Sequence, residues 1–181
     1  MTKKQKEEMT AFESDKFDIT NETGMVAYAD GTFQSFIGNE TSINMNVEGK
    51  TREGSTSTHN HPVDEGGLNT VFSLDDIGVM IHYNEYEKRM VTMEKGRKIV
   101  VRIHQTKNTT LANQMDFYSE VKKACTKMRT ANRKEFRKYF NGEYKSKDDY
   151  YKKVYENVKI YEKVFVEKAK NYNLVFKKEY L

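Results

Sequence analysis

The hydrophobic pattern of the chain changes its period near residue 111, and this change constrains the fold more than any other feature of the sequence. Before it, short segments alternate apolar and polar residues, as "KIVVRIH" does at residues 98–104, which is typical of β-strands. After it, apolar residues recur every three or four positions, which is typical of amphipathic helices. The order is therefore strands, one helix, strands and long helices, and it predicts an α+β fold.

Two hairpins are predicted in the first part of the chain. Residues 24–29 and 32–37 have the pattern of strands, and the Asp-Gly pair at 30–31 is favoured in two-residue hairpin turns. A second hairpin is predicted to turn at the Lys-Gly pair at 95–96. Two hairpins supply at least four strands for one sheet.

The region between these hairpins predicts a strand followed by a helix. Small and β-branched residues in "GSTSTHNHP", residues 54–62, suit the end of a buried strand. Ser73 and Asp76 have the spacing of a helix capping box, which predicts a helix from there to about Tyr83.

The chain is long enough for one domain with a modest extension. We expect a flexible N-terminus or a short helix at residues 1–12, the main domain at 13–110 and a basic helical extension at 111–181 that packs on the domain. Gly142 separates two long amphipathic helices in this extension, and "NLVFKKEYL" at the end has the pattern of a last strand returning to the sheet.

Charge and cysteine content narrow the classes of partner. Residues 111–181 hold 18 Lys/Arg and 10 Asp/Glu, a net +8, so the first 110 residues carry −4 of the total +4. Basic and acidic residues alternate at helical spacing there, which indicates a solvated helix face, and an acidic protein or a second copy of the chain is a more fitting partner than nucleic acid.

Cys125 is the single cysteine, so a disulfide framework and a cysteine-based zinc knuckle are excluded, and we expect it to be a buried core thiol. With no long apolar stretch and no signal-peptide pattern, the sequence predicts a soluble cytoplasmic protein without membrane contact.

Two histidines lie one residue apart at the end of the predicted strand. His59 and His61 project to the same side of an extended segment and could bind one metal ion together. Zinc requires a further protein ligand, and Asp76 at the predicted helix start is a suitable carboxylate. Asp64 and Glu65 are nearer in sequence, but they lie beside glycines and are expected to be solvated.

Two other interpretations of this region remain. Ser73 and Asp76 are equally well explained as a chance capping box. The tripeptide His-Asn-His also invites comparison with HNH nucleases, but that name describes residues spread over a ββα unit, so the match is superficial.

"HNHP" followed by Ser-x-x-Asp resembles the JAMM signature of the JAB1/MPN zinc metalloproteases, and it is closest to RadC-like and phage or mobile-element JAB-like domains. The resemblance implies a cytidine-deaminase-like mixed sheet flanked by helices. It also implies that His59, His61 and Asp76 bind Zn2+, that Ser73 stabilises the oxyanion, and that an upstream glutamate moves protons.

Glu22 is the glutamate favoured by this resemblance. "NETGMVAYADGTFQSFIG" is similar to the opening of the phage-type domains, and it places Glu22 just before the first hairpin. Glu13, Glu40, Glu48 and Glu53 are the alternatives.

The resemblance covers roughly residues 20–105 and departs from the family in one place. Eleven residues, 62–72, separate His61 from Ser73, where the family pattern has seven, so the substrate cleft is expected to differ. The function that the resemblance implies is hydrolysis of an amide bond in a protein or peptide by a zinc-dependent peptidase or isopeptidase, with a phage or mobile element as the source of the chain. The alternatives are a non-catalytic JAB-like structural or inhibitor protein and, as a minor one, a nucleic-acid-binding protein.

Overall fold

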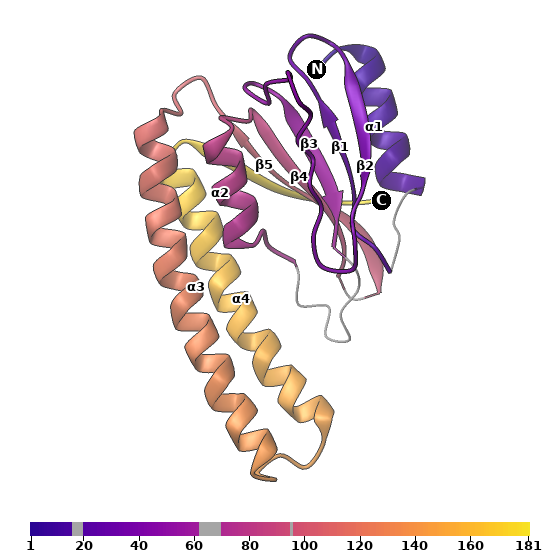
Figure 1. The fold of residues 1–181 in the computed structure, drawn as a ribbon. Helices are drawn as coiled ribbons and strands as arrows, with labels where there is room; N and C mark the ends of the chain where they lie inside the picture. The colour runs from indigo at the N-terminus through magenta and orange to yellow at the C-terminus, as the bar shows by residue number, and fades with distance from the viewer. Residues whose placement is uncertain (16–19, 62–69, 95) are drawn as a thin grey trace.

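The computed structural model describes residues 1–15, 20–61, 70–94 and 96–181, and it confirms the α+β class, with four helices and a mixed six-stranded sheet in that part of the chain (Figure 1). The elements in chain order are α1 (Lys3–Asp15), β1 (Thr23–Ala27), β2 (Phe33–Ile37), β3 (Thr56–Asn60), α2 (Leu74–His82), β4 (Glu87–Glu94), β5 (Arg97–Gln105), α3 (Leu111–Phe140), α4 (Lys147–Asn171) and β6 (Leu174–Tyr180).

The strands lie in the order β2-β1-β3-β4-β5-β6. Among the described strands, β3 and β4 form the one parallel pair, and the helix α2 lies between them in the chain. The other neighbours are antiparallel. A parallel pair requires a crossover, and this crossover brings the start of α2 back toward the end of β3.

Helices cover both faces of the sheet. Figure 1 shows α1 on one side and α2, α3 and α4 on the other, with the α3–α4 hairpin extending beyond the sheet. The main core lies between the sheet and these three helices, because the apolar stripes of the helices meet the inward residues of β4 and β5. Its fully buried members include Ile77, Met80, Met90, Ile99, Val101, Ile103, Phe117, Val121 and Phe165.

The N-terminal segment is the helix α1, the alternative to a flexible N-terminus at residues 1–12. Helix α1 packs on the opposite face of the sheet, where Met9 and Phe12 contact Met25 and Ala27 of β1. Burial of these two side chains holds the helix against the sheet, although its remaining surface is polar.

The two predicted hairpins are confirmed, with small changes at their turns. The first pairs β1 with β2 and turns at Tyr28–Gly31, where the amide of Gly31 donates to the carbonyl of Tyr28 and Gly31 has φ +89°. The second pairs β4 with β5. Its turn residue Lys95 lies outside the described residues, as do Asp64 and Glu65.

The two long C-terminal helices and the returning strand are also present. α3 and α4 pack against each other, and β6 pairs antiparallel with β5 at one edge of the sheet. Residues 111–181 therefore complete the sheet and its core. Cys125 is a free, buried thiol in this core, as expected. In the part of the chain that the structure describes, no helix combines the length and the apolar character needed to cross a bilayer.

An irregular segment at residues 39–55 includes Ile43 and Met45, which pack on the face of β1 and β2. Gly24 of β1 permits this approach, because a Cβ there would lie 2.5 Å from the Sδ of Met45 and 3.1 Å from Ile43. Since Gly24 is paired with His59 across the strands, the segment passes directly beside the histidine strand. It forms one wall of the cavity described below.

Candidate metal centre

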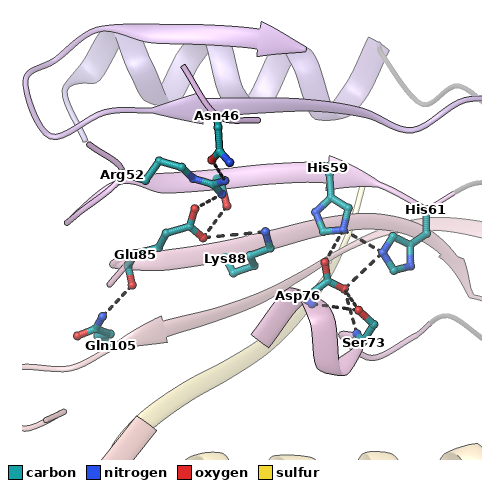
Figure 2. A network of polar contacts seen from close by, with 10 residues as sticks. Asn46, Arg52, His59, His61, Ser73, Asp76, Glu85, Lys88 and Gln105 are labelled. Atoms are coloured by element: carbon teal, nitrogen blue, oxygen red, sulfur yellow. Dashed lines mark hydrogen bonds and ion pairs between the residues drawn. The ribbon is translucent and has the colours of Figure 1, made fainter. Parts of the chain in front are cut away.

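The two histidines converge as the strand pattern predicts. Every residue of β3 is buried, and His59 is its fourth residue. His61 follows the strand, and its amide donates to the carbonyl of Val91, which extends the parallel pairing with β4. The Nε2 atoms of His59 and His61 lie 2.9 Å apart (Figure 2).

Asp76 reaches the same point from the first turn of α2. Its Oδ1 lies 3.0 Å from the Nε2 of His59, and its Oδ2 lies 3.5 Å from the Nε2 of His61. The capping box of α2 holds it there, because the amide and the hydroxyl of Ser73 both donate to Asp76 Oδ2, at 3.0 and 2.7 Å. The same Ser73 hydroxyl accepts the amide of Asp76 at 3.1 Å. Asp76 can therefore cap α2 and serve as a metal ligand in the same position, so both interpretations of the Ser73–Asp76 pair fit this geometry.

These contacts cannot all be hydrogen bonds. Each imidazole nitrogen carries at most one hydrogen. If His59 and His61 both direct their Nε2 hydrogens to Asp76, no hydrogen lies between the two nitrogens, although they are 2.9 Å apart. A cation among the three side chains removes this conflict, because each lone pair then faces the ion.

The donor set also fits a zinc ion in type and spacing. The three ligand atoms lie within 4.8 Å of one another, and two imidazoles with one carboxylate are typical zinc ligands. Bonds of about 2.0–2.2 Å in a tetrahedral arrangement separate donor atoms by roughly 3.4 Å, so these atoms need to shift by only a few tenths of an ångström. The residues present therefore could hold a metal ion.

The protonation states of Asp76 and His59 agree with this role, whereas the metal ion would have to displace a proton that the raised pKa of His61 favours. Burial by itself would raise the pKa of Asp76, but His59 and His61 hold it well below its usual range, so the carboxylate is ionised. Burial lowers the pKa of His59 in spite of the opposing charge of Asp76, so this imidazole is neutral at pH 7. For His61 burial acts in the same direction, but the hydrogen bond and charge of Asp76 outweigh it and raise the pKa. A metal ion binds the deprotonated forms of such ligands.

A cavity of about 680 Å³ opens beside the three ligands. Its walls are α2 on one side and the irregular segment 40–46 on the other, and its lining includes the candidate ligands together with Glu22, Arg52, Tyr83 and Lys88. The cavity is large enough for several residues of a peptide.

Glu22 lies on the wall of this cavity, immediately before β1. Burial raises the pKa of its half-buried carboxyl, and the charge of Asp76 raises it further, while His61 opposes both. A carboxyl whose pKa is shifted toward neutrality is suited to proton transfer at pH 7. Glu22, His61 and Asp76 all line this one cavity.

The competing glutamates occupy other environments. Glu13 is buried on the opposite face of the sheet, where it pairs with Arg89 at 2.6 Å and accepts the hydroxyl of Thr58 at 2.9 Å. Glu48 and Glu53 are exposed and do not line the cavity. Glu40 is exposed and does line it, so it is the one competitor that shares the cavity with Glu22.

Asn60, the residue between the two histidines, holds the segment that carries Glu22. Its side-chain oxygen accepts the amide and, at 2.9 Å, the hydroxyl of Thr23, and its amide donates to the carbonyl of Asn21 at 3.0 Å. This role of Asn60 was not predicted from the sequence. The alternation of side chains along a strand could have predicted it, because the side chain of Asn60 must point to the face of the sheet opposite His59 and His61.

Lys88 was also missed. It is a buried lysine on β4 that lines the cavity beside the candidate ligands (Figure 2). A lysine inside a strand is usually exposed, and only the pairing of β3 with β4 reveals that this one is enclosed.

Comparison of the chain with protein-family models, with curated proteins and with solved structures gave no match.

Proposed function

We propose that this protein is a zinc-dependent hydrolase of JAMM type, with the related JAB/MPN-like fold, that cleaves an amide bond in a protein or peptide. The observation that carries the proposal is the convergence of His59, His61 and Asp76 within 4.8 Å at the wall of a cavity that also contains Glu22. The parts required for metal-assisted amide hydrolysis, three ligands and a proton carrier, are thus together in one place.

His59, His61 and Asp76 would hold the zinc ion. When bound, zinc lowers the pKa of a coordinated water and polarises a substrate carbonyl. Glu22 then takes a proton from the attacking water and delivers it to the nitrogen of the leaving amine. Its raised pKa favours both halves of this transfer, because the carboxyl can accept and return the proton near neutral pH. The half-buried position of Glu22 limits competition from bulk water.

Ser73 is proposed to donate a hydrogen bond to the developing oxyanion. In this structure its hydroxyl donates to Asp76, so the oxyanion role requires the hydroxyl to turn away from that carboxylate when substrate binds. The amide of Ser73 also donates to Asp76, and this second bond keeps the candidate ligand in place during the turn.

The experiment that tests the proposal is a metal and activity measurement on one set of variants. Elemental analysis of the purified chain should show about one zinc per chain, and a peptide library should be cleaved only by the zinc-loaded protein. His61→Ala should lose both zinc and cleavage, whereas Glu22→Gln should lose cleavage alone. A wild-type chain that binds no zinc after reconstitution would contradict the proposal.

A second candidate function is that of a non-catalytic JAB-like structural or inhibitor protein. The hydrogen bond from Ser73 to Asp76 favours it, because a hydroxyl committed to the ligand is not available to the oxyanion. Full zinc occupancy without cleavage of any peptide in the library would support this candidate.

The α3–α4 hairpin is the proposed site of an acidic protein partner or a second copy of the chain. Its far end carries exposed Phe136 and Phe140 among lysines and arginines. Sedimentation of the wild type and of a Phe140→Ser variant would separate self-association from the binding of another protein. A role in binding nucleic acid has only the basic charge in its favour.

A further inference from the structure

Lys88 is a buried cation on the floor of the cavity. It lies on β4 and is 2 % exposed, yet it lines the cavity together with His59 and Glu22. Figure 2 shows it between the Arg52–Glu85 pair on one side and the His59–Asp76 contact on the other. A buried ammonium loses its hydration, so it is destabilising unless an anion or several acceptors replace the water.

The nearest anion, Glu85, is already committed to other partners. One of its oxygens accepts from the guanidinium of Arg52 in a close contact, and the other accepts the hydroxyl of Ser57 at 2.9 Å. The Nζ of Lys88 lies 4.0 Å from Glu85, which is too far for a hydrogen bond. Two cations therefore share one carboxylate, and Arg52 makes the closer contact.

The described chain supplies no other partner to Lys88. Among the described residues its Nζ has one ion-pair contact, the 4.0 Å contact with Glu85, and its charge also lowers the pKa of Glu22 from a longer distance. Arg52 has further partners. Its second terminal nitrogen donates a hydrogen bond to the side-chain oxygen of Asn46, and its guanidinium lies over the ring of Tyr83, 4.7 Å from the ring centroid. One positive charge at the cavity wall is thus left without a close anion.

We propose that Lys88 binds a carboxylate of the substrate, so that the hydrolysed amide lies next to a carboxylate group. This inference rests on the proposed function, since it names the substrate class of the same cavity. Lys88 and the candidate metal ligands line the same cavity. A substrate with its scissile amide at the ligands would therefore place the chemical group next to that amide near Lys88.

A single negative charge fits this position better than a phosphate. Lys88 is one ammonium that shares its ion-pair partner Glu85 with Arg52, and the cavity also contains the carboxylates of Glu22, Asp75 and Asp76. A doubly charged phosphate would leave excess negative charge beside these groups, whereas a carboxylate matches one ammonium. The carboxylate could be the free C-terminus of a peptide or the side chain of an acidic residue.

Nuclear magnetic resonance of the lysine ammonium groups tests the proposal. The signal of Lys88 is assigned by its absence in Lys88→Arg, which retains the charge. Three probes are titrated into the full chain: N-acetylalanine with its terminal carboxylate, N-acetylaspartate methylamide with its side-chain carboxylate, and N-acetylalanine methylamide with neither. We expect both carboxylate probes, and not the neutral probe, to shift the Lys88 signal. The carboxylate probe with the higher affinity identifies whether Lys88 prefers a terminal or a side-chain carboxylate.

Variants give the second measurement, by calorimetry with the tighter probe. Lys88→Met, similar in length but uncharged, should weaken binding about tenfold or more, since a charge-assisted hydrogen bond is lost. Lys88→Arg should stay within about threefold, and Lys170→Met, an exposed lysine at the end of α4, should bind as the wild type does. Equal shifts by the neutral probe, or unchanged affinity in Lys88→Met, would overturn the inference.

The zinc content of each sample separates this outcome from the fate of the proposed function. If zinc is absent but carboxylates still bind through Lys88, the hydrolase proposal fails and the carboxylate site remains. If zinc is bound and amides are cleaved while Lys88→Met behaves as the wild type does, the inference fails alone.

Discussion

Asn60 holds Thr23 by two hydrogen bonds, since its side-chain oxygen accepts both the amide and the hydroxyl of that residue. Its side-chain amide donates to the carbonyl of Asn21, so the chain is held on both sides of Glu22. The backbone of Glu22 is also paired with the end of β2, through Asn39 at 2.7 Å and Gly38 at 2.8 Å. The same tripeptide therefore presents two candidate ligands on one face and positions the candidate proton carrier from the other.

Replacement of Asn60 by alanine should loosen the Glu22 segment without removing the metal ligands. Loss of partners for buried polar groups typically costs about 1–3 kcal/mol, so we expect the free energy of unfolding to fall by about that amount. Hydrogen exchange at the amide of Thr23 should become faster. Gln34→Ala, at an exposed position of β2, is the control and should change neither quantity. An unchanged exchange rate at Thr23 in Asn60→Ala would show that the strands alone hold this segment.

Removal of any candidate ligand should release the metal. His59→Ala, His61→Ala and Asp76→Asn should each lose most bound zinc by elemental analysis, because two protein ligands seldom retain the ion. Zinc should also raise the melting temperature of the wild type, since it binds the folded state. His82→Ala is the matched control, because His82 is an exposed histidine at the end of α2. Retention of zinc by all three ligand variants would place the ion elsewhere.

Replacement of Glu22 by glutamine should separate proton transfer from metal binding. We expect full zinc occupancy and a loss of hydrolysis on the order of 10²–10⁴-fold, the usual effect of removing a general base. Glu40→Gln is the control, because Glu40 lines the same cavity from its exposed rim. If Glu40→Gln abolishes cleavage and Glu22→Gln does not, the two glutamates exchange roles.

Glu94 should make the contact between the sheet and α4 sensitive to acid. Burial by itself would raise the pKa of Glu94, but a 2.7 Å hydrogen bond from Lys159 and the charge of Lys178 lower it below the ordinary 4.5. A carboxyl with a lowered folded-state pKa stabilises the fold fully above its unfolded pKa, and this contribution is lost as the pH falls through the folded pKa. Chemical denaturation should therefore show wild type more stable than Glu94→Gln at pH 7.

The difference should begin to shrink near pH 4.5, the ordinary pKa of glutamate, and should disappear as the pH falls through the lower folded-state pKa of Glu94. Glu167→Gln, at an exposed position on α4, should lack this pH dependence. A gap between wild type and Glu94→Gln that is the same at pH 7 and at strongly acid pH would show that the charge of Glu94 does not contribute.

Local features of this protein were determined by the sequence itself. The alternation in "KIVVRIH" predicts β5, and the spacing of Ser73 and Asp76 predicts the start of α2. The strand period also places His59 and His61 on one side. Each of these features depends on residues within a few positions of one another, and backbone geometry converts such spacings directly into structure.

Other features were decided only by the tertiary structure. Helix α1 is polar enough to suggest a tail, and it is ordered because Met9 and Phe12 find a complementary surface on β1. The enclosure of Lys88 depends on the parallel pairing of β3 with β4, which joins residues about 30 positions apart in the chain. Such positions become buried or exposed only when distant segments meet, since burial is a property of the assembled layers and no spacing within one segment encodes it.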